Sequence, residues 1–161
     1  MLKTVFILLL LTASGRAAEA EPAAPALASR SLILENSTMP LPTAKATLIV
    51  GQLARTNAVY AGDFKVKVFP YFFKSDWGRL AIDVPDAALA AIHYGKTVAI
   101  TGTSTSAKNG IVRHIQITAM PVDRDHGTVT LWFMAGDQKM VFTTAYHFGG
   151  HSPAQPSILR Q

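Results

Sequence analysis

The side chains best suited to hold a ligand lie in one run of alternating residues, from Phe64 to Phe73. Successive side chains of a strand point to opposite faces, so this run separates an apolar face from a charged and aromatic one. The apolar face consists of Phe64, Val66 and Val68. The opposite face consists of Lys65, Lys67 and Phe69 and, past Pro70, of Tyr71 and Phe73. Ammonium groups beside aromatic rings are suited to an anionic or stackable ligand, such as a strand of nucleic acid or sugar.

Trp77 and Arg79 complete the candidate binding surface. Trp77 lies in the turn that follows the run, where it is either a lid over the binding face or a plug for one end of a barrel. Arg79 begins the next strand and is expected beside the lysines. The alternative is that an N-terminal arm or a C-terminal hairpin covers the rings, because large exposed apolar patches are uncommon on monomeric proteins.

No catalytic motif accompanies this surface. The sequence contains no Gly-x-Ser-x-Gly, no His-Glu-x-x-His, no phosphate-binding loop and no dinucleotide fingerprint. His126, His147 and His151 are the only basis for an alternative, a metal-assisted hydrolase. Metal ligation needs three or four converging donors, and a strand end that runs into a glycine pair does not align His147 with His151. We therefore expect surface histidines, no metal, no cofactor and no enzymatic activity.

The alternation of apolar residues predicts a mainly β fold with one short helix. The helix is expected from Asp86 to Gly95, with Asp86 accepting hydrogen bonds from the first amides and Gly95 ending the helix in a left-handed cap. Asn109-Gly110 is a strong hairpin signal between two strands. The predicted strands are 46–54, 64–73, 79–84, 97–106, 111–120, 128–134 and 140–148.

Three strands, a helix and two further strands make the order of an OB-fold, a small five-stranded Greek-key barrel. The helix is followed by Gly95-Lys96-Thr97-Val98-Ala99-Ile100-Thr101-Gly102 and by a strand that ends Ile115-Gln116-Ile117. In these features residues 46–122 resemble the exported bacterial OB-fold proteins of unknown function, including those grouped as anticodon-binding-like. The resemblance spans about half the chain and implies an OB-fold-like five-stranded barrel, to which the C-terminal β-hairpin is added. In that fold the outer face of the second and third strands is the common binding surface.

The N-terminal residues have the pattern of a cleaved secretory signal. Met1-Leu2-Lys3 is a positive start, Val5 to Leu11 is an apolar run, and Ala18-Glu19-Ala20 offers the small residues that signal peptidase needs. The apolar run is shorter than the roughly 20 residues that a membrane span requires. We expect residues 1–20 to be removed and the protein to be periplasmic or secreted, not an integral membrane protein.

The remaining segments give the predicted domain organisation. Residues 21–44 are rich in alanine and proline and are interpreted as a linker or arm, in which Ser31 to Leu34 could add one short edge strand. Residues 45–148 are expected to form the β domain with its C-terminal hairpin. Residues 149–161 are expected to form a flexible tail.

Composition limits the functions that remain. Of the 161 residues, 49% are apolar and 16% are charged, and none is cysteine, which excludes a disordered chain and thiol chemistry. Without residues 1–20 the chain has 13 basic and 9 acidic side chains, a net charge of +4 that suits anionic partners. We expect an exported non-catalytic binding module for an anionic ligand, an oligosaccharide or an extended peptide. Nucleic acid fits the fold but not the compartment.

The alternative function is that of a structural or assembly protein of the cell envelope. The C-terminal hairpin would then be an interaction edge that pairs with another copy of the chain or with an envelope component.

Overall fold

The computed structural model describes residues 27–151, which form ten β-strands, one α-helix and one short 3-10 helix. The predicted signal peptide, residues 1–20, and the tail from residue 152 onward lie outside the described residues. The helices are η1 (Phe72–Lys74), between β5 and β6, and α2 (Asp86–His93), between β6 and β7. The strands are β1 (Arg30–Leu34), β2 (Ser37–Leu41), β3 (Ala44–Val50), β4 (Ala54–Thr56), β5 (Val59–Phe69), β6 (Asp76–Asp83), β7 (Val98–Ser106), β8 (Val112–Pro121), β9 (His126–Ala135) and β10 (Gln138–His151).

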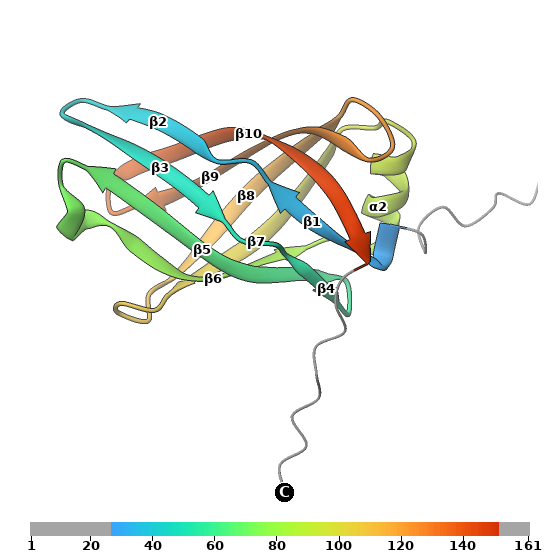
Figure 1. The fold of residues 1–161 in the computed structure, drawn as a ribbon, viewed down its shortest axis with the longest axis horizontal. Helices are drawn as coiled ribbons and strands as arrows, with labels where there is room; N and C mark the ends of the chain where they lie inside the picture. Colours follow the sequence, from blue (N-terminus) through green and yellow to red (C-terminus); the bar gives the residue numbers. More distant parts are fainter. Residues whose placement is uncertain (1–26, 152–161) are drawn as a thin grey trace, which may run out of the picture.

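All ten strands belong to one curled antiparallel sheet with the shape of a barrel (Figure 1). The strand order in the sheet is β1-β10-β9-β8-β7-β6-β5-β3-β2. From β5 to β10 each strand pairs with the next one in the sequence, and the short β4 also pairs with β5. The predicted mainly β class with one short α-helix is therefore confirmed. The predicted five-stranded Greek-key barrel with an added C-terminal hairpin is not observed, because the described residues form ten strands in one sheet whose order from β5 to β10 follows the chain.

The two N-terminal strands bring the ends of the sheet together. β1 pairs with β10, and Leu32 exchanges two backbone hydrogen bonds of 2.9 Å with Leu53, just before β4. β2 pairs with β3. If β1–β2 and β3–β4 are each counted as one interrupted strand, eight strands surround the interior. A barrel of this size either packs its interior with side chains or holds one small ligand.

Residues 30–44 are thus part of the barrel and not of a linker. The predicted strand from Ser31 to Leu34 is observed as β1, but it pairs with β10 and does not lie at a free edge. Alanine and proline suggested an arm, yet Pro40 fits in β2 because this strand ends the sheet order and needs hydrogen bonds on one side only. The predicted C-terminal hairpin is observed as β9 and β10, which follow β1 in the sheet order and lie between β1 and β8.

Helix α2 covers one end of the barrel, at the right of Figure 1. Its buried residues are Ala88, Leu89 and Ile92, in agreement with the predicted apolar side. Gly95 has φ of +72°, the left-handed conformation predicted for the cap. The predicted cap at the start is wrong, because the side chain of Asp86 makes no cap hydrogen bond and instead accepts one of 2.7 Å from Arg55 Nη2.

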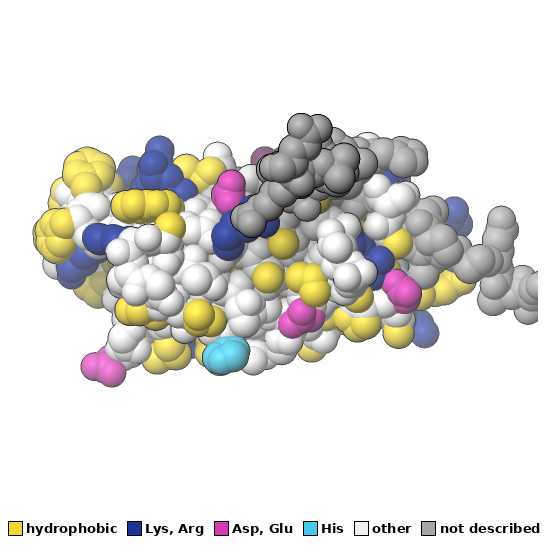
Figure 2. Space-filling model, turned by 90° about the horizontal axis from the view of Figure 1, so that it is seen from below, with side chains coloured by type: hydrophobic (Ala, Val, Ile, Leu, Met, Phe, Trp, Pro, Cys, Tyr) yellow, Lys and Arg dark blue, Asp and Glu magenta, His cyan; other side chains and the backbone are white. Residues whose placement is uncertain are grey.

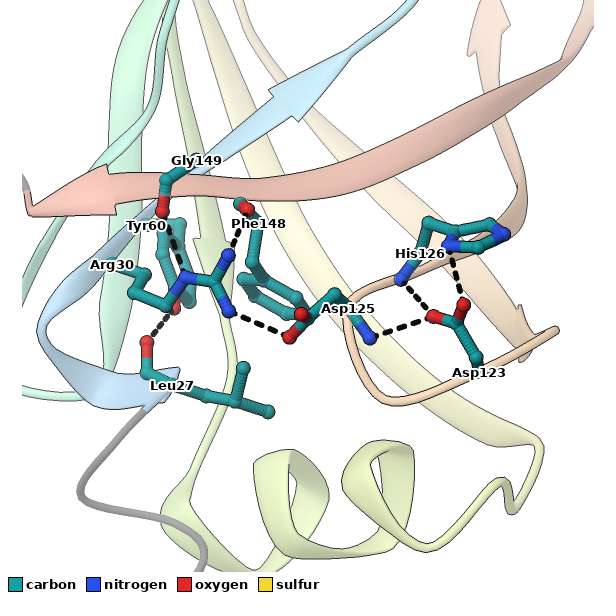
Figure 3. A network of polar contacts seen from close by, with 8 residues as sticks. All are labelled: Leu27, Arg30, Tyr60, Asp123, Asp125, His126, Phe148 and Gly149. Carbon is teal, nitrogen blue, oxygen red and sulfur yellow. Dashed lines mark hydrogen bonds and ion pairs between the residues drawn. The ribbon is translucent and has the colours of Figure 1, made fainter.

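At the end covered by α2, Arg30 of β1 forms hydrogen bonds with β10 and an ion pair with the β8–β9 turn (Figure 3). Its Nε and Nη2 donate to two backbone carbonyls of β10 at 2.8 and 2.6 Å, and its Nη1 lies 2.6 Å from Asp125 Oδ1 in the β8–β9 turn. Asp123 holds the same turn by accepting hydrogen bonds from the backbone N–H groups of Asp125 and His126. These bonds keep the pKa of the Asp123 carboxyl below its usual range.

Candidate ligand-binding site

The interior of the barrel is packed at the end covered by α2 and hollow at the other end. Near α2 the unfilled space is about 30 Å³. At the opposite end a cavity of about 540 Å³ lies beside the β2–β3, β5–β6 and β9–β10 turns. Small-molecule pockets typically measure roughly 300–1,000 Å³. The cavity is lined by Leu41, Pro42, Thr43, Ala44, Leu48, Phe64, Val66, Val68, Tyr71, Lys74, Asp76, Leu80, Ser104, Arg113, Ile115, Leu131, Phe133, Ala135, Gln138 and Met140.

The alternation of side chains along the strands builds the apolar walls of the cavity. Phe64, Val66 and Val68 point inward from β5 and are buried, as the period of two predicts. Leu131 of β9 and Met140 of β10 do the same from the C-terminal hairpin. The walls are therefore mainly aliphatic and aromatic, which is the usual surrounding of an apolar ligand.

One wall carries a charged pair. Arg113 on β8 donates from Nη1 to Asp76 Oδ2 on β6 at 2.8 Å, and the two side chains are 21% and 17% exposed. Asp76 Oδ1 accepts two more hydrogen bonds, from Ser106 Oγ on β7 at 2.5 Å and from the backbone N–H of Trp77 at 2.9 Å. The neighbouring strands β6, β7 and β8 thus place this polar group in a cavity that is otherwise mainly apolar.

The charged side chains of the cavity have an excess of positive charge. A guanidinium has five N–H donors, and within residues 27–151 the structure gives Arg113 one acceptor, Asp76. Lys74 also lines the cavity, with its Nζ 5.4 Å from the centroid of the Tyr71 ring. Two cations and one carboxylate leave a net charge of +1 on the lining, which favours an anionic group on a ligand.

Five of the seven residues predicted for the site share the outer face of β5 and β6. Lys65, Lys67 and Phe69 point outward from β5. Trp77 lies opposite Lys65, on β6 and not in the predicted turn, so it is neither a lid nor a plug but part of the outer wall. Arg79 is on the same side, with its Nη1 3.3 Å from the carboxylate of Asp63. A shallow hollow lies among Lys65, Trp77 and Arg79.

Tyr71 and Phe73 are not on this outer face, so the predicted alternation past Pro70 is wrong. β5 ends at Phe69, because Pro70 has no backbone N–H with which to continue the ladder. The chain then turns into η1. Tyr71 lines the cavity, and Phe73 is exposed with its ring centroid 6.0 Å from that of Tyr71.

Sequence reasoning missed the Asp76–Arg113 pair of the cavity, although a signal for both residues was present. The alternation that places Ile115 inward on β8 also places Arg113 inward, and Leu80 implies the same for Asp76 on β6. A charge at an inward position next to buried apolar residues is therefore the feature that identifies this pair. The cavity itself has no such local signal.

The histidines considered for a metal site are only partly described. His126 and His147 lie opposite each other on β9 and β10, and His126 Nδ1 is 2.7 Å from Asp123 Oδ2. The side chain of His151 lies outside the described part of the structure. No group of three or more His, Cys, Asp or Glu side chains that could hold a metal ion occurs among the residues that are described.

In the described segment, residues 27–151, no helix has the length and the apolar character needed to cross a membrane. Comparisons of the chain with models of protein families, with curated proteins and with solved structures give no significant match.

Proposed function

We propose that this chain is a non-catalytic binding module that holds one small amphipathic molecule in the barrel, with the apolar body of the ligand in the cavity and an anionic group at Arg113. The observation that carries the proposal is a cavity of about 540 Å³ with mainly apolar walls and an inward arginine. None of the residues that line the described cavity is a histidine or a cysteine. The lining therefore supports binding better than nucleophilic chemistry.

The apolar walls supply most of the affinity in this proposal. Each Å² of apolar ligand surface that leaves water contributes roughly 25 cal/mol. Because the walls belong to paired strands, the cavity exists before the ligand arrives, and little ordering has to accompany binding.

The Asp76–Arg113 pair supplies the selectivity. Asp76 holds one side of the guanidinium and leaves other N–H groups to a ligand. A carboxylate, sulfonate or phosphate can accept two parallel hydrogen bonds from an arginine, and such bonds are stronger where water is partly excluded. Lys74, exposed at the rim, adds a second cation.

Calorimetric titration with dodecanoate, and with dodecanol as its uncharged counterpart, tests the cavity. Ser104 is buried and lines the cavity, while its neighbour Thr105 points outward. We expect Ser104→Phe to narrow the cavity and weaken binding of both compounds, and Thr105→Phe to leave binding unchanged. Parent-like binding of dodecanoate by the Ser104→Phe protein would contradict the proposal.

The anionic part is tested with the double variant Asp76→Asn/Arg113→Met, which leaves no charge unpaired. We expect the affinity for dodecanoate to fall by about 10-fold or more, because a charge-assisted hydrogen bond contributes roughly 1.5–3 kcal/mol. The affinity for dodecanol should be unchanged. Arg79→Met, on the outer face, is the matched control.

A second candidate is the outer face of β5 and β6 as a surface for an anionic or stackable ligand or an extended peptide. It is supported by the exposed rings of Phe69 and Trp77 beside Lys65 and Lys67. Phe69→Ala is expected to leave the melting temperature nearly unchanged while binding of a sulfated oligosaccharide is lost. A large drop in melting temperature would show that this ring serves packing.

We place both binding functions ahead of an assembly role for the C-terminal hairpin. β9 pairs with β8, and β10 pairs with β1, so neighbouring strands already occupy both sides of the hairpin along the paired residues. Export to the periplasm or the medium stays a prediction from residues 1–20.

A further inference from the structure

The end of β5 and the β5–β6 connection expose three phenylalanine rings at the open end of the barrel. Phe69, Phe72 and Phe73 are 53%, 66% and 70% exposed. These three residues are named the aromatic lip. Figure 2 shows hydrophobic and basic side chains gathered at the left end of the molecule, the end at which Figure 1 places the β5–β6 turn. Large apolar side chains grouped on a surface mark a site of interaction.

The aromatic lip is held in place by contacts that leave its rings in solvent. The rings of Phe69 and Phe72 meet edge to face, with centroids 5.7 Å apart. Lys108, in the β7–β8 turn, donates from Nζ to the carbonyl of Phe73 at 2.7 Å. These two contacts hold the connection in place, while the three rings remain exposed to solvent.

The charge around the aromatic lip is almost entirely positive. No acidic residue occurs in residues 64–75 or in residues 37–50. Asp76, which follows, points into the cavity and is ion-paired. The β9–β10 turn contributes Asp137, two residues before Lys139. Basic residues on the connection or near it are Lys45, Lys65, Lys67, Lys74 and Lys108. Further along the two strands, Arg79 on β6 is ion-paired with Asp63 on β5.

We propose that the aromatic lip and its lysines dock the protein onto the surface of an anionic lipid bilayer. Aromatic side chains insert at the boundary between headgroups and acyl chains, and lysines at the same level are attracted to anionic headgroups. Neighbouring rings are tilted by 75° and 66° to each other, so they do not form one continuous flat platform for successive nucleic acid bases, which insertion of single rings into a bilayer does not need. The positive charge and the arrangement of the rings therefore favour a bilayer surface over nucleic acid as the partner.

Docking would bring the mouth of the cavity to the membrane. Tyr71 and Lys74, which flank Phe72 and Phe73 in the chain, both line the cavity. An amphipathic ligand in the cavity would then lie next to the bilayer surface. The docking proposal depends on the aromatic lip and the lysines near it and does not require that the cavity be occupied.

Sedimentation with vesicles tests the proposal, using protein produced from the full-length sequence. Vesicles of phosphatidylcholine with phosphatidylglycerol are compared with vesicles of phosphatidylcholine alone. We expect binding to the first kind, weakened by about 10-fold or more in Phe72→Ser/Phe73→Ser, because two exposed rings that insert are removed. The matched control is Tyr94→Ser/Val122→Ser, which removes two exposed apolar side chains near the closed end and should bind like the parent.

The lysines are tested with Lys65→Gln/Lys67→Gln against Lys96→Gln/Arg124→Gln. The first double variant should bind vesicles with phosphatidylglycerol about 10-fold more weakly, and the second should bind as the parent does. Added salt should reproduce the first result, because it screens exposed charges. All variants carry the same N-terminal residues, so the difference between them reports on the aromatic lip.

Three outcomes would overturn the proposal. The first is equal binding to vesicles with and without phosphatidylglycerol, or to neither. The second is an equal loss in the lip variant and in its closed-end control. The third is a dimer, measured by light scattering, that Phe72→Ser/Phe73→Ser dissociates, because the aromatic lip would then be the contact with a second copy of the chain.

Discussion

Arg113 Nη1 lies 2.8 Å from Asp76 Oδ2, so two opposite charges meet inside an otherwise apolar part of the barrel wall. Removal of one partner leaves the other charge without its counterion, which costs roughly 3–5 kcal/mol when the pair is fully buried. Because water reaches both side chains here, we expect Arg113→Met to lower the free energy of unfolding by about 2 kcal/mol. Urea unfolding followed by circular dichroism measures the loss.

The double variant Asp76→Asn/Arg113→Met shows how much of the stability comes from the ion pair and how much from packing of the aliphatic part of Arg113. With both charges gone, the free energy of unfolding should fall by less than about 1 kcal/mol relative to the parent. A double variant as unstable as Arg113→Met alone would show that the ion pair is not what stabilises this wall.

Tyr60 and Tyr146 are both buried but differ in their hydroxyl groups. Tyr60 Oη donates a hydrogen bond of 3.1 Å to the carbonyl of Leu27, while Tyr146 Oη has no partner among the described residues. We expect Tyr60→Phe to lower the free energy of unfolding by about 1 kcal/mol, and Tyr146→Phe to leave it unchanged or to raise it slightly. Equal effects in parallel urea titrations would contradict this difference.

The same two tyrosines predict a loss of stability in alkali. Burial raises the pKa of Tyr60 to about 12 against the opposing charges of Arg55 and Arg30, and burial with the charge of Asp123 raises the pKa of Tyr146 to about 12. The unfolded phenols titrate near pH 10. Between pH 10 and 12 the folded chain therefore binds more protons than the unfolded chain, and the free energy of unfolding falls as pH rises.

This stabilisation is complete below pH 10 and is lost as pH rises through about 12. Urea unfolding at a series of pH values measures the decline. Tyr60→Phe/Tyr146→Phe should show a much smaller decline over that window, and a variant that follows the parent curve would assign the loss to other groups.

The backbone of β7 leaves no room for a side chain at Gly78 on β6. A Cβ added there would lie only 1.9 Å from the carbonyl oxygen of Thr105 on β7, too close for either backbone to remain in place. We expect Gly78→Ala to cost more than about 2 kcal/mol of unfolding free energy. Gly150→Ala, whose Cβ would meet nothing within 4 Å, should change it by less than about 0.5 kcal/mol. Thermal unfolding compares the two.

Much of the local structure could be predicted from the chain. The inward face of β5, the buried side of α2 and the left-handed Gly95 all follow from periods of two or of 3.6 and from the freedom of glycine. The predicted strand beyond Phe69 was wrong, because Pro70 ends the backbone pairing while the alternation of side-chain types continues past it. Pro70 ended the strand, so Tyr71 turned toward the cavity although alternation placed it outside.

The sequence by itself determined the mainly β class, the short helix and the outward direction of Lys65, Lys67 and Phe69, because these depend on neighbours a few positions away. Only the tertiary structure decided that residues 30–44 join the barrel, that all ten strands form one curled sheet and that a cavity remains at one end. The physical reason is distance along the chain. The hydrogen bond from Arg30 to Gly149, one of those that join the first strand to the last, connects residues 119 positions apart. No local sequence pattern shows with which distant strand a segment will pair.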